Sequence, residues 1–262
     1  MIPLSAKENE GMTKGRSGRL VILSGPSCVG KSPMVKALAR FYPDLRHTLQ
    51  LLVLYNSRPP RPGEADGVDY HFRTRQQVQA LKADDRFIVE EVRGDLQALD
   101  MVQLSTLLGQ GNAFFEGNPF VGQTLQIHPR LSQVEKLSVF LSPLSREEIQ
   151  FLRAPDRNVS IPDLVTDVMR RKLLRRTRRQ KGELSLSDLE NIERRAASAY
   201  RELQAAQHFS HVIPNHDGED SENWDAFYYP LGDARTTLLM FASLLEGKVP
   251  SGIEHWEQDL IP

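Results

Sequence analysis

Short apolar runs alternate with amphipathic segments along most of this chain. Apolar runs bounded by Gly, Pro or Ser are typical of buried strands, whereas apolar residues spaced three and four apart are typical of helices. The apolar runs predict strands at residues 20–24, 49–55, 70–72, 86–92, 112–115, 137–141 and 211–214. The amphipathic segments predict helices at residues 31–41, 74–82, 101–108, 144–152, 164–179, 187–206 and 232–245. Strands that alternate with helices indicate an α/β fold with a parallel core sheet.

The start of the helix at 187–206 and the end of the final helix can be placed more closely. Ser187 and Glu190 have the spacing of a capping box, so we expect the helix at 187–206 to begin there. The final helix ends near Gly247, and the residues after it show no periodicity. We therefore expect a loose C-terminal tail at 248–262.

The first strand, the loop after it and the first helix contain a phosphate-binding motif. The loop reads GPSCVGKS, which matches the pattern G-x-x-x-x-G-K-[ST] in the strand–loop–helix context that this motif requires. Its residues are Gly25, Pro26, Ser27, Cys28, Val29, Gly30, Lys31 and Ser32. Glycines let successive N–H groups turn around an anion, and the helix start adds its positive end. The motif predicts an ATP site in which Lys31 contacts the β- and γ-phosphates and Ser32 binds Mg²⁺.

Pro33 follows this motif, where Thr is more usual. Proline is tolerated in a first helical turn but has no N–H to offer a nucleotide. We expect Pro33 to weaken nucleotide binding by roughly 1–2 kcal/mol, the value of one charge-assisted hydrogen bond.

Composition narrows the class of protein. The 262 residues suffice for one large α/β domain or for a core with inserted subdomains. A net charge of −1 provides no overall field toward nucleic acid or membrane, although residues 170–181 are strongly basic. Residues 1–17 are polar, lack the apolar segment of a signal peptide and are expected to be a disordered leader. The single cysteine, Cys28, cannot form an internal disulfide, which fits a reducing cytoplasm.

A second unusual segment, residues 57–72, reads SRPPRPGEADGVDYHF. With the phosphate-binding loop upstream, it resembles the guanylate kinase family, which joins a GPSGVGKST loop to a TTRxPRPGExDGxDYHF segment. The resemblance implies a P-loop three-layer sandwich with a parallel core sheet, an inserted acceptor-binding subdomain and a helical lid. It places the core at 18–50, 100–160 and 207–247, the acceptor-binding subdomain at 51–99 and the lid at 161–206. The implied reaction is phosphoryl transfer from ATP to GMP with Mg²⁺.

The resemblance also assigns residues to the acceptor phosphate. Arg58, Arg61 and Tyr70 match the family residues that grip the phosphate of GMP. The chemistry agrees independently, because two guanidinium groups held apart by stiff prolines form a clamp for a dianion. The family lid arginines match Arg175, Arg179 and Arg195, which would neutralise charge on the transferred phosphoryl group.

Three further positions are implied by the resemblance. Glu116 matches an acidic residue that orders Mg²⁺, and Asn118 replaces a second aspartate. Asn215 matches a residue near the adenine of ATP. An ordinary turn at the end of a strand is an equally good interpretation of Asn215.

The residues that read guanine in the family are changed here. Leu54 stands where the family has a base-contacting Ser, and the Tyr-Tyr-Gly-Thr run of the acceptor pocket is absent. Glu90 or Glu91 is a candidate for the base-reading glutamate. Two alternatives therefore remain open beside a GMP kinase: a kinase of another nucleotide or a sugar phosphate, and a nucleotide- or protein-binding module without turnover. The lid arginines have an alternative as well, as a solvated or RNA-binding face.

Overall fold

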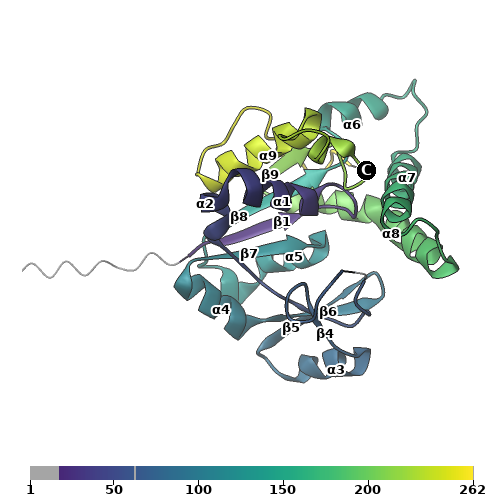
Figure 1. The fold of residues 1–262 in the computed structure, drawn as a ribbon. Helices are drawn as coiled ribbons and strands as arrows, with labels where there is room; N and C mark the ends of the chain where they lie inside the picture. Colours follow the sequence, from purple (N-terminus) through teal and green to yellow (C-terminus); the bar gives the residue numbers. More distant parts are fainter. Residues whose placement is uncertain (1–17, 62, 262) are drawn as a thin grey trace, which may run out of the picture.

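A five-stranded parallel sheet forms the centre of the molecule in the computed structural model, which describes residues 18–61 and 63–261. The strand order is β2-β7-β1-β8-β9 (Figure 1). The strands are β1 (Leu20–Ser24), β2 (Leu49–Leu51), β7 (Asn112–Gly117), β8 (Lys136–Ser142) and β9 (His211–Pro214). The predicted α/β class with a parallel core sheet is confirmed. The expected leader at 1–17 lies outside the described residues.

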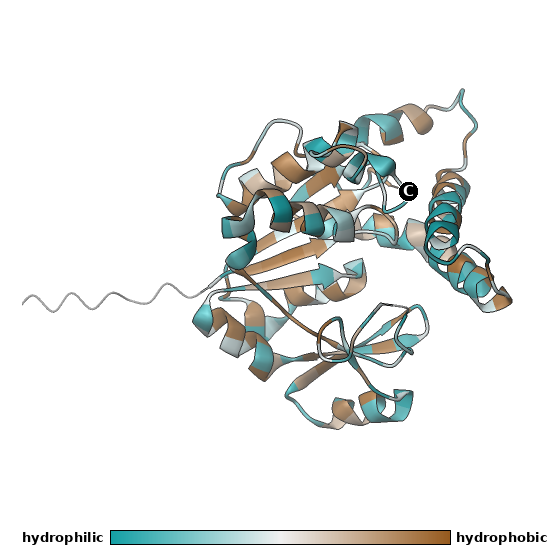
Figure 2. Ribbon diagram, in the orientation of Figure 1, coloured by the Kyte–Doolittle hydropathy of each residue, from teal (hydrophilic) through white to brown (hydrophobic). Residues whose placement is uncertain are grey.

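Helices cover both faces of this sheet and make a three-layer sandwich. Alternate residues of β1 point to opposite faces, so Leu20 and Ile22 join one apolar core while Val21 and Leu23 join another. The apolar strands lie between amphipathic helices (Figure 2). The first face packs on α4 (Met101–Gln110) and α5 (Pro119–Ile127), and the second on α1 (Lys31–Phe41) and α9 (Gly232–Leu245).

A smaller mixed sheet, in the order β4-β3-β6-β5, lies below the core in Figure 1. Its elements are β3 (Tyr55–Asn56), β4 (His71–Phe72), β5 (Phe87–Val92), β6 (Asp95–Asp100) and the adjoining α3 (Arg75–Ala80). The single strand predicted at 49–55 is wrong, because its two ends pair in different sheets. Strand β6 was not predicted at all, since only its pairing with β5 and β3 makes it a strand.

Two long antiparallel helices, α7 (Ile161–Lys181) and α8 (Leu186–Gln204), form an arm on the right of Figure 1. We call this pair the helical arm. The predicted capping box of α8 is wrong by two residues. Ser185 Oγ accepts the Asp188 N–H at 3.2 Å and the Asp188 carboxylate accepts the Ser185 N–H at 3.1 Å.

Shorter helices complete the described chain. They are α2 (Pro43–His47), α6 (Arg146–Leu152) and single 3₁₀ turns at Leu81–Ala83, Pro129–Leu131, Ala205–His208 and Glu222–Trp224. Among the residues that the structure describes, no helix combines the length and apolar character needed to cross a membrane.

The C-terminal segment packs against the core, so the expectation of a loose tail is wrong. Trp256 is 2% exposed and Leu260 is buried in the same core as β1. Glu254 exchanges two backbone hydrogen bonds with Val212 of β9, at 2.8 and 2.9 Å. Isolated apolar residues give no periodic signal in the sequence, and only the partner surface makes them core residues.

Candidate active site

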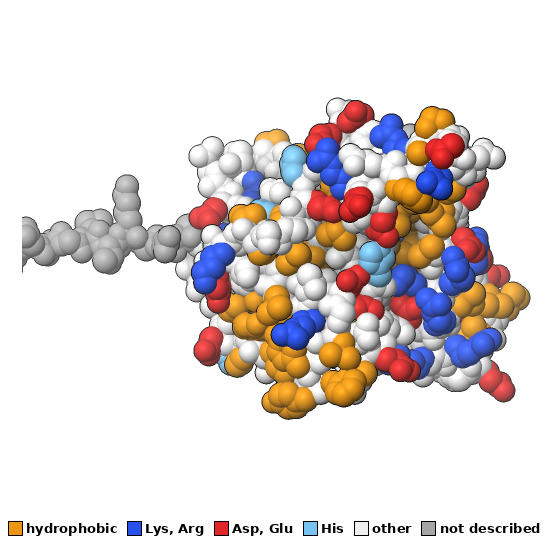
Figure 3. All heavy atoms as spheres, turned by 90° about the horizontal axis from the view of Figure 1, so that it is seen from above, with side chains coloured by type: hydrophobic (Ala, Val, Ile, Leu, Met, Phe, Trp, Pro, Cys, Tyr) orange, Lys and Arg blue, Asp and Glu red, His pale blue; other side chains and the backbone are white. Residues whose placement is uncertain are grey.

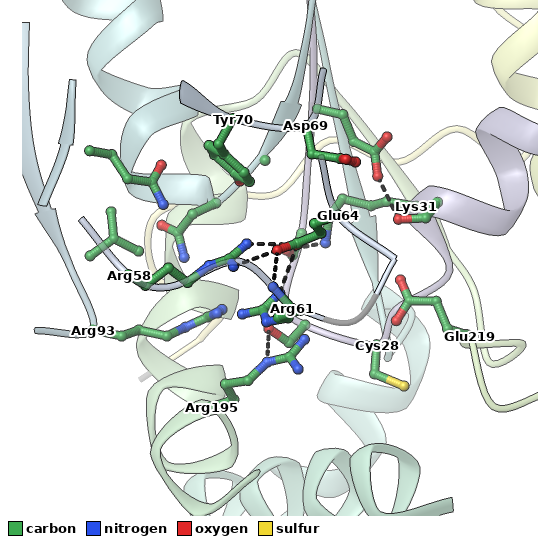
Figure 4. Close-up of a pocket in the computed structure, with 18 of the residues that line it drawn as sticks. Cys28, Lys31, Arg58, Arg61, Glu64, Asp69, Tyr70, Arg93, Arg195 and Glu219 are labelled. Atoms are coloured by element: carbon green, nitrogen blue, oxygen red, sulfur yellow. Dashed lines mark hydrogen bonds and ion pairs between the residues drawn. The ribbon is translucent and has the colours of Figure 1, made fainter. Parts of the chain in front are cut away.

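The phosphate-binding loop and the Arg/Pro-rich loop open on one cavity of about 270 Å³ (Figure 4). The cavity lies where the core sheet, the small sheet and the helical arm meet, because each part contributes lining residues. The predicted site residues that line it are Gly25, Ser27, Cys28, Lys31, Ser32, Arg58, Arg61, Tyr70, Glu116, Asn118 and Arg195. The predicted residues that do not line it are Pro26, Val29, Gly30, Pro33, Glu90, Arg175, Arg179 and Asn215.

The loop between β1 and α1 has the backbone of an anion cradle. Gly25 and Gly30 have φ values of 152° and 103°, and a Cβ on Gly25 would lie 2.4 Å from the Leu141 carbonyl oxygen. The Lys31 ammonium donates to the carbonyl oxygens of Gly25 at 2.7 Å and Pro26 at 2.8 Å. Burial lowers the pKa of Lys31. The cradle is therefore a ring of backbone groups around a single buried cation.

Ser32 and Glu116 meet beside this cradle. Strand β7 runs parallel to β1, so Glu116 near its carboxyl end lies next to the loop that follows β1. Ser32 Oγ donates to Glu116 Oε1 at 2.9 Å. Burial raises the pKa of Glu116, although Lys31 and Ser32 act in the opposite direction. A hydroxyl and a carboxylate are oxygen donors of the kind that Mg²⁺ prefers, so the pair fits this ion.

Within the Arg/Pro-rich loop, the carboxylate of Glu64 holds both arginines in place. Arg58 forms a two-pronged ion pair with Glu64, at 2.6 and 2.7 Å, and Glu64 also accepts the Arg61 N–H at 2.7 Å. The Arg58 guanidinium lies 5.1 Å from the centre of the Tyr70 ring. Burial and the neighbouring Arg58 lower the pKa of Arg61 to about 10. Two neighbouring guanidinium groups that repel each other favour a bound anion, which would relieve the repulsion.

The helical arm brings a different pair of arginines to the cavity than the sequence predicts. Arg195 donates to Ser27 Oγ at 2.9 Å, as a buried contact between α8 and the phosphate-binding loop. Arg176, rather than Arg175 or Arg179, is the arginine of α7 that lines the cavity, where it lies 3.5 Å from Glu219. Burial and the cations Arg176, Arg61 and Arg93 hold the pKa of Arg195 well below its usual value.

The structure places Arg175 and Arg179 outside the cavity. The Arg175 guanidinium pairs with Asp220 at 2.7 Å and Arg179 lies 3.7 Å from Asp225. The buried stripe of α7 includes Met169 and Leu173, and helical periodicity extends that stripe to residue 176. The same periodicity could have identified Arg176 from the sequence.

The other charges of the arm are largely paired at its surface. Figure 3 shows its Lys and Arg side chains interspersed with acidic ones. Arg170 lies 2.8 Å from Glu193, and Arg171 lies 2.9 Å from Asp167. This pairing favours a solvated face over a continuous cationic surface for RNA.

Comparison with known proteins decides the family. A family model described as guanylate kinase matches residues 17–96. A guanylate kinase from Synechococcus sp. (strain JA-3-3Ab) is 31% identical over 217 residues, which cover 81% of this chain and 83% of that protein. The chain belongs to the guanylate kinase family. A guanylate kinase from Alkalilimnicola ehrlichii is 32% identical over 201 residues and covers 76% of this chain and 82% of its own length.

A solved structure agrees with the guanylate kinase fold. The crystal structure of guanylate kinase from Anaplasma phagocytophilum superposes with a TM-score of 0.53 at 17% identity, covering 88% of this chain and 86% of that one. At this identity the match shows the fold alone. The family resemblance inferred from the two loops is confirmed by the sequence relatives.

Nine residues of this guanylate kinase family member line the cavity without having been predicted as site residues, and three of them are polar side chains from outside α7 and the two motif loops. These three are Arg93 from the turn between β5 and β6, Gln97 from β6, and Glu219 from the loop after β9. Each lies in a segment whose sequence has no motif, and only the folded chain brings it to the phosphate-binding loop. Sequence reasoning had no signal for them beyond their charge or polarity.

Two predicted base-contacting residues have other partners. Asn215 is fully buried, and its side-chain N–H groups donate to the Val29 and Asp217 carbonyl oxygens at 2.7 Å each. It therefore holds the loop after β9 against the phosphate-binding loop. Glu90 accepts the Thr124 hydroxyl at 3.1 Å beside a small space of about 10 Å³. Glu91 is instead exposed and lies 3.5 Å from Arg75.

His216, in the same loop after β9, predicts a pH dependence of stability. Its ring nitrogens lie 2.9 Å from Glu148 and 2.5 Å from Asp233. Burial opposes the charged form, but the two carboxylates outweigh it and raise the pKa of His216 above its usual 6.5. A raised pKa contributes stability that is complete below the unfolded value and is lost as pH rises through the folded value.

We expect His216→Gln to lower the free energy of unfolding at about pH 6 and to have little effect at about pH 9. Urea denaturation of both proteins at the two pH values measures this difference. His255→Gln, at an exposed position, is the control. A destabilisation that is equal at both pH values would contradict the ion-pair origin.

Proposed function

We propose that this protein is an ATP-dependent guanylate kinase, which transfers the γ-phosphoryl group of ATP to GMP and releases ADP and GDP. One observation carries the proposal: Lys31 in its ring of backbone groups and the pair Arg58/Arg61 line the same cavity. Phosphoryl transfer of this kind needs two aligned anions screened by cations, with no covalent intermediate on the protein. The relatives named guanylate kinase support the same acceptor.

On the donor side, Lys31 and the N–H groups of the loop hold the β- and γ-phosphates of ATP. Ser32 and Glu116 hold Mg²⁺, which when bound screens the phosphate charge. Pro33 supplies no N–H, so the cradle relies on fewer donors than a loop with Thr at this position. Asn215 acts indirectly, by fixing the loop after β9.

On the acceptor side, Arg58, Arg61 and Tyr70 hold the phosphate of GMP. Arg195 and Arg176 of the helical arm neutralise the negative charge that develops on the transferred phosphoryl group, because both line the cavity. Arg175 and Arg179 do not line it. The small sheet is thus the acceptor-binding subdomain and the helical arm is the lid.

The guanine edge has fewer polar partners. Gln97 lines both the main cavity and the small space that holds Glu90, Leu54 and Leu99. We assign a base contact to Gln97, which lines the main cavity as Asn118 does, whereas Glu90 does not line it and accepts the Thr124 hydroxyl instead. Fewer hydrogen bonds to the base predict weaker discrimination among acceptors.

A coupled assay of ADP release tests the proposal. With ATP and Mg²⁺, we expect GMP to stimulate ADP release far above the rate without acceptor, and AMP, CMP, UMP and sugar phosphates to stimulate it less. ADP release that follows another acceptor in preference to GMP would contradict GMP as the substrate. ATP binding without stimulation by any acceptor would contradict the kinase assignment.

A further inference from the structure

We propose that Arg93 is a third arginine of the acceptor-phosphate clamp, held in place from the helical arm by the buried carboxylate of Glu202. The inference rests on the proposed function and adds a residue to its acceptor site. It also names the contact through which the acceptor site and the arm depend on each other.

The position of Arg93 is the first support. It occupies the two-residue turn between β5 and β6 and lines the cavity together with Arg58 and Arg61. Figure 4 shows its guanidinium directed toward Arg61 from the side of the small sheet. The side chain is 15% exposed, which is low for an arginine at the tip of a hairpin.

The partners of Arg93 are the second support. Its Nε donates to Ser198 Oγ at 2.9 Å and to Glu202 Oε1 at 2.7 Å, and its Nη2 donates to Glu202 Oε2 at 2.7 Å. Glu202 has no exposed surface and also accepts the Asn118 amide N–H at 3.0 Å. These bonds fix the plane of the guanidinium. Within the described residues Nη1 has no hydrogen-bond partner, and its N–H groups remain for a ligand.

The backbone of the turn is the third support. Arg93 has φ 54° and the following Gly94 has φ 84°. A two-residue turn of this kind favours Asn, Asp or Gly at its first position, and a long side chain is unfavourable there. The interactions of Arg93 outside the turn therefore have to hold it in this conformation, as is frequent at ligand-binding sites.

The excess of arginines over carboxylates in the clamp indicates an anionic ligand. Arg58 is already paired with Glu64, and Arg93 with Glu202, so each cation has one neutralising carboxylate. Arg61 adds a cation that is paired only loosely, at 3.8 Å from Glu64. A tetrahedral phosphate monoester dianion can accept hydrogen bonds from three directions, so it matches the N–H groups that the three arginines offer.

The connection to Glu202 links the acceptor site to the arm. Arg93 belongs to the small sheet, Glu202 to α8 of the arm and Asn118 to the start of α5 in the core, so one carboxylate joins all three parts. α8 also carries Arg195, which contacts the phosphate-binding loop. Glu202 is accordingly a positioning residue that acts through Arg93.

Steady-state kinetics of Arg93→Met test the clamp. We expect the KM for GMP to rise by about tenfold to a hundredfold, with the KM for ATP unchanged and a smaller change in kcat. Arg93→Lys keeps the charge and should recover part of the loss. The control is Arg75→Met, because Arg75 donates to the Gly94 carbonyl oxygen of the same turn without lining the cavity. An unchanged KM for GMP in Arg93→Met, with any loss confined to stability, overturns the proposal.

The double variant Arg93→Met/Glu202→Gln tests the positioning role. If Glu202 acts through Arg93, its removal adds little to the KM of Arg93→Met. Additive increases in the KM for GMP would overturn that role.

A phosphate titration separates this inference from the identity of the acceptor. In a Lys31→Met background the donor cradle is impaired, so thermal stabilisation by inorganic phosphate reports mainly on the arginine clamp. We expect Arg93→Met to reduce that stabilisation, as Arg58→Met does. If GMP is not turned over by the wild type, the proposed function fails while this result still supports the clamp. Equal stabilisation with and without Arg93 overturns it.

Discussion

Replacing Lys31 with methionine lowers kcat for phosphoryl transfer by roughly a thousandfold or more, the scale of losing a principal cation of a phosphoryl-transfer site. The ammonium is the cation at the centre of the phosphate-binding loop, with Gly25 and Pro26 carbonyl oxygens as its partners. Methionine has similar length and apolar character but no charge, so the loop keeps its volume and loses its attraction for the γ-phosphate. Activity with saturating ATP and GMP measures the effect.

The fold should survive this substitution. A buried charge is costly to desolvate, so its removal offsets part of the loss of its hydrogen bonds. We expect the free energy of unfolding to change by about 1 kcal/mol. Lys36→Met, on the exposed side of the same helix, is the matched control and should keep full activity. A Lys31→Met protein with activity within tenfold of wild type would remove the phosphate-binding loop from the mechanism.

Replacing Arg58 with methionine lowers kcat/KM for GMP by roughly a hundredfold to a thousandfold. Two losses combine here. The phosphate loses one two-pronged guanidinium partner, for about 1.5–3 kcal/mol. Glu64, which pairs with Arg58 at 2.6 Å, is left in the cavity without its main neutralising partner and repels the incoming dianion. The measurement is kcat/KM for GMP at saturating ATP, and the KM for ATP, measured at saturating GMP, should be unchanged.

Glu64 provides the internal test of this explanation. The bonds from Arg58 and Arg61 outweigh the effect of burial and lower the pKa of Glu64, so its carboxylate is charged at neutral pH. The double variant Arg58→Met/Glu64→Gln removes the repulsion and should recover part of kcat/KM. Arg73→Met replaces a partly exposed arginine that pairs with Asp66 outside the cavity, and it should behave as wild type. A double variant that is weaker than Arg58→Met would refute the repulsion.

The helix ends show how far local patterns extend. Thr74 and Gln77 form the capping box of α3, at the residue where the helix predicted at 74–82 begins. The box of α8 begins two residues earlier than predicted, with Ser185 and Asp188 in place of Ser187 and Glu190. Both pairs have the capping-box spacing of a serine followed by an acidic residue three positions later, so the local pattern alone does not choose the start of the helix.

By itself the sequence determined the phosphate-binding loop, the Arg/Pro-rich clamp and the alternation of strands with helices. These depend on local chemistry: glycines at residues 25 and 30 permit positive φ, prolines stiffen the arginine loop, and apolar spacing sets the element type. Only the tertiary structure decided that Arg93 and Glu219 join the cavity and that Trp256 is a core residue. Such choices depend on which surfaces meet across long sequence separations, and no local pattern encodes the partner.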